Sequence, residues 1–389
     1  MYYGFLETIS IENDFVNLEF DSFKSSLFTS FQEIDGRQPL YEDVFHISLK
    51  VPKKKNHKFE LDHWYNLKVG EGDISGSSRR LFINQANEEN LIIKEIKKID
   101  GRSREGKDLY RYFSFEGFPP ADLAQIELLF SQQKSKKHYV AVYDVGQGNC
   151  NAVCADGQGV LFYYDFGADI RTNVGTYPVN QRYCLSHNPF VILSHWDKDH
   201  WFASHHFPAV KNMFWIVPDQ KIGISHRIFA NELNANGKLL LWPNHLTHLP
   251  FSFGEIVKCT GRYRNDSGLA LHIGLINGRQ RKNVLLPGDS AYRYIPNIPQ
   301  TLHGMVASHH GGNVHGNIPA PANNRCATVF SVSMNPHHGH PIPRMVQRYV
   351  NLGWQDVRTS LYGHVGFSNQ PMTIGCAGNN CNLQITRWY

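Results

Sequence analysis

The chain lacks any run of about 18 apolar residues, the length that a helix needs to cross a membrane. Its first residues also lack the basic region and the long apolar stretch of a secretory signal peptide. Its seven cysteines are few for 389 residues and odd in number, which argues against a secreted disulfide framework. We therefore expect a cytoplasmic protein with no membrane partner.

Acidic residues are scarce in the second part of the chain. Residues 138–389 contain 19 Lys and Arg but only 12 Asp and Glu, a net charge of +7. Residues 1–137 contain 20 and 22, a net charge of −2. Histidine is divided in the same way, with 3 residues in the first part and 18 in the second. A basic, histidine-rich segment is typical of a metal site that receives an anionic substrate.

The sequence predicts two domains, with the polar and basic segment 131–137 as the boundary. Residues 1–137 are expected to form a small β-rich domain, a barrel or a sandwich, that binds substrate or a partner and ends in a helix over 122–132. Its expected strands are short alternating stretches at 45–51, 80–84, 91–96 and 110–115. In residues 138–389, strands at 139–144, 160–165 and 190–194 alternate with helices at 222–236 and 343–352.

The strongest motif follows an apolar strand, in the sequence Val-Ile-Leu-Ser-His-Trp-Asp-Lys-Asp-His that ends at His200. Alternate spacing points His195, Asp197 and Asp199 the same way, and His200 joins them as the chain turns. Four such side chains at a strand end are costly unless something neutralises and coordinates them. The motif therefore predicts a metal site rather than a solvated turn.

This motif resembles the His-x-His-x-Asp-His signature of the metallo-β-lactamase superfamily, with Asp197 in place of the second His. Four more segments follow the family order: Asp-Val-Gly-Gln-Gly at 144–148, Asp-x-Gly at 165–167, Gly-Asp at 288–289 and His-His-Gly at 309–311. With Gly-His-Pro at 339–341, the set is similar to the subgroup typified by the C-terminal domain of the DNA-uptake protein ComEC. The chain departs from the subgroup in having Trp-Phe-Ala at 201–203 instead of a glycine pair, and the family's isolated middle His is not evident.

For residues 138–389 the resemblance implies an α/β (α+β) fold, the αββα metallo-β-lactamase sandwich, with metals at one sheet edge. By carry-over, Asp199, His200, Asp289 and His310 would be metal ligands, and His195 and Asp197 would complete a second metal. Two divalent ions bridged by a carboxylate can hold a hydroxide at neutral pH and clamp a phosphoryl oxygen. An Asp in place of a His favours Mn²⁺, Mg²⁺ or Fe, with Zn²⁺ as the alternative.

Other residues are expected around this centre. The resemblance makes Asp199 part of the catalytic centre, His309 a ligand or a contact to a phosphate oxygen, and His340 a substrate contact or acid. Arg262 and Arg264 are candidates to line an anionic groove. Trp196 and Trp201 flank the motif and would either stack on a nucleic-acid base or pack in the core.

The expected function is that of a metal-dependent phosphodiesterase or nuclease that uses a metal-bound hydroxide, with nucleic acid or a nucleotide as its partner. One alternative is a hydrolase of a small nucleotide or of a phosphocholine-like ester. Another is a subunit of a multi-protein system, such as bacterial defence, that acts only with a protein partner bound through residues 1–137.

Overall fold

A computed structural model describes most of the chain as two compact units. The described residues are 1–33, 37–53, 58–70, 75–82, 85–131, 137–156, 159–168, 177–178, 181–277, 280–334, 339–369 and 385–389. The first unit is Met1–Phe118 with Gln220–Ala235, and the second is Pro119–Asp219 with Asn236–Tyr389. This division falls before the boundary expected after residue 137, and it adds a segment from the middle of the chain to the first unit.

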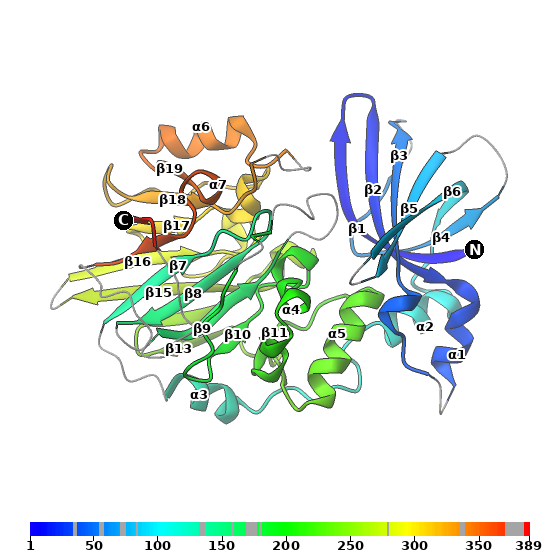
Figure 1. The fold of residues 1–389 in the computed structure, drawn as a ribbon, viewed down its shortest axis with the longest axis horizontal. Coiled ribbons are helices and arrows are strands. Elements are labelled where there is room, and N and C mark those ends of the chain that lie inside the picture. Colours follow the sequence, from blue (N-terminus) through cyan, green and yellow to red (C-terminus); the bar gives the residue numbers. More distant parts are fainter. Residues whose placement is uncertain are drawn as a thin grey trace. The chain divides into compact units, whose positions relative to one another are not determined.

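The first unit is built on a closed barrel with the strand order β1-β2-β3-β5-β6-β4 (Figure 1). Its strands are β1 (Tyr2–Glu12), β2 (Phe15–Lys24), β3 (Phe45–Pro52), β4 (Trp64–Val69), β5 (Ser75–Phe82) and β6 (Gln85–Lys98). Of the two β architectures that the sequence allowed, the barrel is the one observed. Alternate residues of β2, such as Leu18 and Phe20, fill its interior together with Leu67 from β4.

The α-helices of the described part of this unit are α1 (Phe28–Gln32), α2 (Arg104–Tyr112) and α5 (Ile224–Ala235). Their buried side chains form a second cluster with barrel residues that include Phe23 and Trp64. Ile224 and Ile228 of α5 are part of this cluster, which explains why that segment folds with the barrel rather than with its sequence neighbours.

The strand expected at 110–115 is wrong, because α2 ends within that segment. The side chain of Ser103 caps the helix by accepting the Gly106 N–H group. Leu109 and Phe113, four residues apart, are both buried. Alternating aromatic residues suggested a strand. The Ser103 cap and the helical spacing of Leu109 and Phe113 instead favour the helix that is observed.

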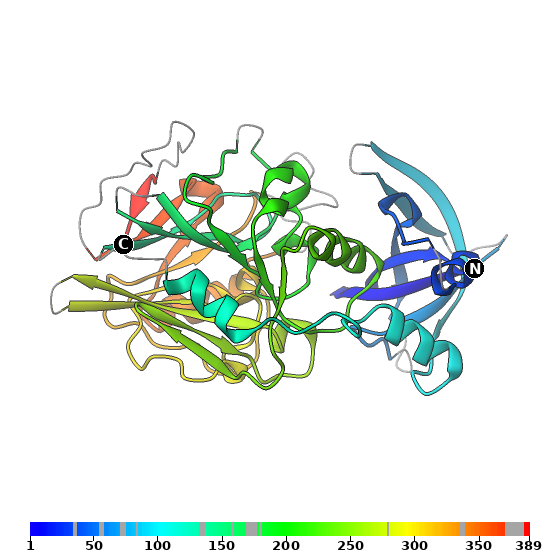
Figure 2. The ribbon, with the colours of Figure 1, turned by 90° about the horizontal axis from the view of Figure 1, so that it is seen from below.

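The second unit contains two sheets, visible as separate layers in Figure 2. The first has the order β12-β11-β10-β9-β8-β7-β20-β21, and the second has the order β13-β14-β15-β16-β17-β18-β19. The strands of the first sheet are β7 (His138–Val142), β8 (Cys150–Ala155), β9 (Gly159–Phe166), β10 (Phe190–Ile192), β11 (Trp215–Val217), β12 (Leu239–Leu241), β20 (Val365–Phe367) and β21 (Arg387–Trp388). Those of the second are β13 (His248–Phe251), β14 (Gly254–Lys258), β15 (Leu269–Asn277), β16 (Gln280–Leu286), β17 (Gly304–Val306), β18 (Ala327–Phe330) and β19 (Gln355–Arg358).

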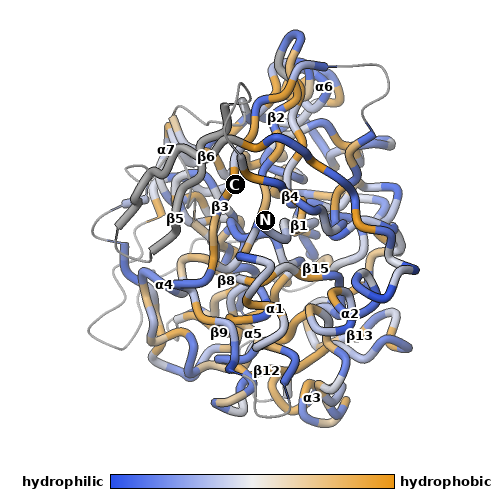
Figure 3. Tube along the Cα trace, turned by 90° about the vertical axis from the view of Figure 1, so that its right-hand side faces the viewer, coloured by the Kyte–Doolittle hydropathy of each residue, from blue (hydrophilic) through white to orange (hydrophobic). Residues whose placement is uncertain are grey.

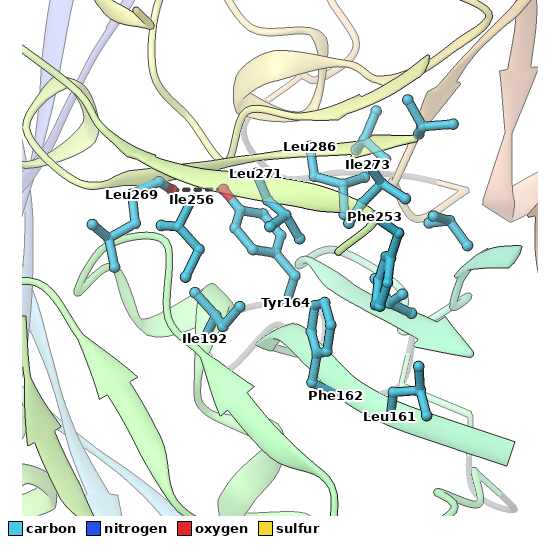
Figure 4. Packing of buried hydrophobic residues seen from close by; sticks show 14 of the residues in the cluster. Leu161, Phe162, Tyr164, Ile192, Phe253, Ile256, Leu269, Leu271, Ile273 and Leu286 are labelled. Carbon is cyan, nitrogen blue, oxygen red and sulfur yellow. Dashed lines mark hydrogen bonds between the residues drawn. The ribbon is translucent and has the colours of Figure 1, made fainter. Parts of the chain in front are cut away.

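The main core lies between these two sheets (Figure 4). Phe162 and Ile192 from the first sheet pack with Leu271 from the second. The Tyr164 hydroxyl crosses between the sheets and donates a 2.7 Å hydrogen bond to the Leu269 carbonyl oxygen. Burying the tyrosine with this hydrogen bond satisfies its one polar atom.

Helices cover the outer faces. Tyr163, which alternates with the inward-facing Phe162 and Tyr164, packs on Tyr183 instead. Tyr183 in turn contacts Phe207, just after α4 (Ala203–His206). On the other sheet, buried residues of α6 (Pro343–Asn351) pack in a cluster with Leu285 of β16. The remaining helices of this unit are α3 (Leu123–Ser131) and α7 (Thr359–Tyr362). The predicted αββα sandwich and the helices expected near 122–132 and 343–352 are confirmed.

Within the described part of the chain, no helix is long and apolar enough to cross a membrane. The hydropathy colours accordingly change at short intervals along the trace in Figure 3. The described cysteines, at 150, 154, 184, 259 and 326, are buried.

Candidate metal centre

The polar motifs meet at one end of the sandwich, where neighbouring parallel strands finish. β9 and β10 are parallel neighbours in the first sheet, and β16 and β17 are parallel neighbours in the second. Asp165 closes β9, His195 follows β10, Asp289 follows β16 and His310 follows β17. Because the carboxyl ends of parallel strands lie together, residues far apart in sequence converge there.

Two glycines let the chain fold tightly behind Asp199. A Cβ at Gly167 would lie 1.7 Å from the Asp199 carbonyl oxygen, and one at Gly148 would lie 2.9 Å from it. The same carbonyl accepts a 3.0 Å hydrogen bond from the Asn149 N–H group. The Asp-Val-Gly-Gln-Gly and Asp-x-Gly segments therefore act as a backbone cradle for the metal motif.

His309 and His310 both adopt left-handed backbone conformations, with φ values of 51° and 52°. Asp165 does the same, with a φ of 62°. Such conformations are unfavourable for side chains with a Cβ and persist where the surroundings impose them, often at functional sites. At 309–310 the result is a sharp turn that sends two consecutive imidazoles toward Asp289.

The predicted ligands do come together. The Nε2 atom of His200 lies 3.1 Å from Asp289 Oδ1, and that of His310 lies 3.0 Å from Asp199 Oδ2. The Nε2 atom of His195 lies 3.8 Å from Asp289 Oδ2. Two groups of potential ligand atoms result, one of His195, His200 and Asp289 and one of Asp199, His200 and His310.

Each of the three buried imidazoles is held through its other nitrogen. The Nδ1 atom of His200 lies 2.8 Å from Asp165 Oδ2, that of His310 lies 2.9 Å from the Ser331 carbonyl oxygen, and that of His195 lies 2.9 Å from Ser194 Oγ. In the described part of the chain, the three Nε2 atoms are buried without a hydrogen bond. An imidazole oriented by an acceptor at Nδ1, with its Nε2 lone pair aimed at carboxylates, is the arrangement of a metal ligand. The residues present therefore fit a divalent metal.

The pKa shifts of Asp289 and His200 also indicate that this cluster favours positive charge. Burial opposes ionisation of Asp289, but the imidazoles of His200, His309 and His310 outweigh it and hold its pKa well below the usual range. Burial also opposes the charging of His200, yet Asp289, Asp165 and Asp199 raise its pKa well above the ordinary value. The carboxylates thus require neutralising cations, a role that a divalent metal can take.

Asp197 is paired with Arg264. Arg264 Nε lies 2.5 Å from Asp197 Oδ1, and His195 Nε2 lies 3.3 Å from Asp197 Oδ2. Burial would raise the pKa of Asp197, but the Arg264 guanidinium and then His195 lower it to about 2. Arg264 is buried and ion-paired rather than lining an open groove, whereas Arg262 is exposed.

The suggestion that Trp196 and Trp201 stack on a base is not supported, because both side chains are fully buried. The Trp196 indole N–H donates to the Pro218 carbonyl oxygen, and that of Trp201 donates to the Trp196 carbonyl oxygen. A stacked base needs an exposed ring face, so these residues are core residues, the other alternative that the sequence left open.

His309 and His340 lie at the open side of the cluster. The His309 side chain is 38% exposed, and its Nε2 atom lies 3.8 Å from Asp289 Oδ2. The ring centroids of His309 and His340 are 5.1 Å apart. The side chains of Asp197 and Asp199 are also partly exposed, at 21% and 29%, whereas His200 is fully buried. The cluster is therefore open to solvent on one side.

Sequence reasoning missed the residues that orient the ligands. Asp165 accepts hydrogen bonds from the Ser194 N–H and hydroxyl groups, at 2.6 and 2.9 Å, and from the Asn149 side chain at 3.1 Å. Asp165 was visible as the Asp of the Asp-x-Gly turn, and Ser194 as the residue before His195. Nothing in the sequence marks the Ser331 carbonyl, which belongs to the backbone.

A third group of potential ligands, Glu7, Asp21 and His226, lies within the first unit. His226 Nε2 lies 3.1 Å from Glu7 Oε1, but its Nδ1 accepts a 3.0 Å hydrogen bond from the Gly223 N–H group. A neutral imidazole that accepts at Nδ1 carries its proton at Nε2, which then faces Glu7. The hydrogen bonds that link α5 to the barrel in this group run from the Ser225 N–H and hydroxyl groups to Asp21 of β2. His226 differs from the histidines of the metal centre because its Nδ1 accepts a hydrogen bond.

Comparison with protein-family models and with curated proteins gave no match. Among solved structures, the chain is similar to an isothiocyanate hydrolase from Delia radicum gut bacteria, with 12% sequence identity and a TM-score of 0.33. The similarity covers 56% of this chain and 94% of that one. At this TM-score the similarity carries no conclusion. What the structure itself defines is an αββα sandwich with His/Asp groups that could bind a metal at one end.

Proposed function

We propose that the second unit is a metal-dependent hydrolase that cleaves phosphodiesters. The observation that carries the proposal is the set of buried imidazoles at His195, His200 and His310, each held at Nδ1 and each presenting Nε2 toward the carboxylates. A bound divalent metal would polarise a phosphoryl oxygen and make a coordinated water a nucleophile at neutral pH.

The chain's own residues supply the rest of the site. Asp199, His200 and His310 would hold the metal, and Asp165 fixes the orientation of His200. Asp289 Oδ1 lies 3.1 Å from His200 Nε2, beside this group. His309, which is partly exposed beside Asp289, is placed to donate a hydrogen bond to a substrate or leaving oxygen. The open side at Asp197, Asp199 and His309 is the route by which substrate would arrive.

An anionic substrate is favoured by charge. Residues 138–389 have a net charge of +7, which attracts polyanions over distances set by ionic strength. A phosphodiester of nucleic acid or of a nucleotide meets this condition, whereas a neutral amide or ester would gain nothing from it.

The test begins with the metal content of the purified protein, measured by elemental mass spectrometry. Cleavage of bis-p-nitrophenyl phosphate and of single-stranded DNA is then measured with added Mn²⁺. We expect bound metal and cleavage, both abolished in His310→Ala and retained in a matched control, His245→Ala, at an exposed position. Competition between mononucleotides and polymeric DNA separates a nuclease from an enzyme for small phosphate esters. Cleavage that persists in His310→Ala after chelation would disprove the proposal.

A further inference from the structure

Arg264 is fixed in place by the loop between β14 and β15. It begins a single 3₁₀ turn, Arg264–Asp266, which is closed by a 2.7 Å hydrogen bond from the Gly261 N–H group to the Asp266 carbonyl oxygen. The Asp266 side chain accepts the Ala291 N–H group at 2.8 Å. At the end of the loop, the Leu269 N–H group donates to the Ser194 carbonyl oxygen, beside His195. The guanidinium is thus held against the strand end that carries the metal motif.

The two groups of potential ligands in the centre share one residue, His200. Its Nδ1 atom is 2.8 Å from Asp165, so its Nε2 atom, 3.1 Å from Asp289 and 3.8 Å from Asp199, is the one left for a metal. An imidazole nitrogen has a single lone pair and can bind only one metal through it. If His200 serves the metal held by Asp199 and His310, the other position keeps only His195 and Asp289 of its group. A divalent ion held by two protein ligands is poorly bound, because metal sites normally use three or four.

Asp197 is the residue that could serve as a third ligand at the second position. Its negative charge, however, is already neutralised by Arg264. Its Oδ1 atom is 2.5 Å from the Arg264 guanidinium, and Arg264 is only 3% exposed. Arginine stays protonated under all ordinary conditions, so the positive charge cannot leave. A divalent ion at this position would have to bind next to a permanent, poorly solvated cation.

We propose that the centre binds one metal, through Asp199, His200 and His310, and that the Arg264 guanidinium supplies the positive charge at the second position beside His195 and Asp197. This inference rests on the proposed metal-dependent function, and it departs from the pair of metals that the sequence led us to expect. Arg264 is here a positioning residue, since it holds Asp197 rather than contacting substrate.

The experiment counts metal ions per folded chain. The full-length protein is loaded with MnCl₂, freed of excess metal by gel filtration, and analysed by elemental mass spectrometry and by electron paramagnetic resonance. We expect one Mn²⁺ per chain with the hyperfine pattern of an isolated ion. Arg264→Ala should bind a second Mn²⁺ and show the spectrum of a spin-coupled pair, because Asp197 becomes available. Arg264→Lys keeps the positive charge and should therefore still bind one Mn²⁺ per chain.

A double variant provides the matched control. Arg264→Ala with Asp197→Asn should return to one ion per chain, because the carboxylate that completes the second position is gone. Two ions in the wild-type protein would overturn the inference while leaving the proposed hydrolase intact. No ion in the wild type would overturn both. If Arg264→Ala fails to fold, as judged by circular dichroism, the wild-type count and its spectrum still decide between one ion and two.

Discussion

Asp165 and His200 form a buried pair in which the carboxylate Oδ2 atom lies 2.8 Å from the imidazole Nδ1 atom. Asp165 also accepts hydrogen bonds from the Ser194 N–H and hydroxyl groups. One carboxylate therefore ties the end of β9 to the metal motif after β10 and sets the direction in which His200 presents Nε2.

Replacing this carboxylate should weaken metal binding although Asp165 is not itself a proposed ligand. We expect Asp165→Asn to lower the affinity for Mn²⁺ by about 10–100-fold, the usual effect of losing the acceptor behind a ligating histidine. Isothermal titration calorimetry of the metal-free protein measures this change. Asp156→Asn is the control, because Asp156 follows β8 and lies outside the groups of potential metal ligands. Equal affinities in the two variants would contradict the role of Asp165.

The cradle behind Asp199 makes a second prediction, at Gly167. An added methyl group would lie 1.7 Å from the Asp199 carbonyl oxygen, so the motif must shift to admit it. We expect Gly167→Ala to lower the free energy of unfolding by about 1–3 kcal/mol, as overpacking does, and to reduce metal retention. Urea denaturation and metal analysis test this. Gly101→Ala is the control, because its nearest contact is a tyrosine ring at 3.2 Å. A Gly167→Ala protein that is as stable as the wild type and fully loaded with metal would contradict the proposed role of Gly167 in holding the Asp199 backbone.

Much of the candidate site was predictable because its residues follow strands directly. The apolar strand β10 ends at Ile192, so the motif that follows it lies at a strand end, as the sequence predicted. The alternation expected for His195, Asp197 and Asp199 does not extend that far, because Asp199 lies in the 3₁₀ turn Lys198–His200. The order of the later segments, to Asp289 and His310, then placed the remaining ligands at neighbouring strand ends.

The rest depends on contacts that leave no local pattern. The ion pair between Arg264 and Asp197 joins a loop of one sheet to a strand end of the other. No sequence pattern near Arg264 predicts this ion pair. The segment that forms α5 reads as an ordinary helix, and only its packing with residues such as Phe23 places it in the first unit. Trp196 illustrates the same limit, because a side chain beside a metal motif can face either the solvent or the core.

A third prediction concerns the dependence of stability on pH. His138 stacks on Phe253 with ring centroids 3.8 Å apart, and burial lowers its pKa from 6.5 to about 4. Between these values the unfolded chain binds a proton that the folded chain does not, so stability must fall as the pH drops from about 6.5 toward 4. Above pH 6.5 both states are neutral, and the contribution is constant.

His138→Phe keeps a ring against Phe253 but removes the titrating group. We expect its unfolding free energy to fall less steeply below pH 6.5, with a slope smaller by at most about 1.4 kcal/mol per pH unit, the value for one proton. Urea titrations at several pH values measure the two slopes. His248→Phe, at an exposed position of β13, should leave the slope as in the wild type. Parallel curves for His138→Phe and the wild type would show that His138 does not contribute.

A final prediction separates His200 from His226, two buried histidines that both face carboxylates. His200 has an acceptor at Nδ1, whereas His226 Nδ1 accepts the Gly223 N–H group and so leaves a proton at Nε2. Only His200 can offer a lone pair to a metal without losing a hydrogen bond. We expect His200→Gln to lose bound metal and His226→Gln to retain the wild-type metal content.

The cost of His226→Gln should appear in stability instead. Asp21 accepts the Ser225 N–H and hydroxyl groups, at 2.9 and 2.8 Å, and with Glu7 and His226 it holds the start of α5 to the barrel strands. Loss of one buried hydrogen-bonding partner in such a group costs about 1–3 kcal/mol. Thermal unfolding followed by circular dichroism should therefore show a lower midpoint for His226→Gln, with metal analysis of the same sample as the internal comparison. A fall in metal content in this variant would mean that the barrel group, and not only the sandwich, binds metal.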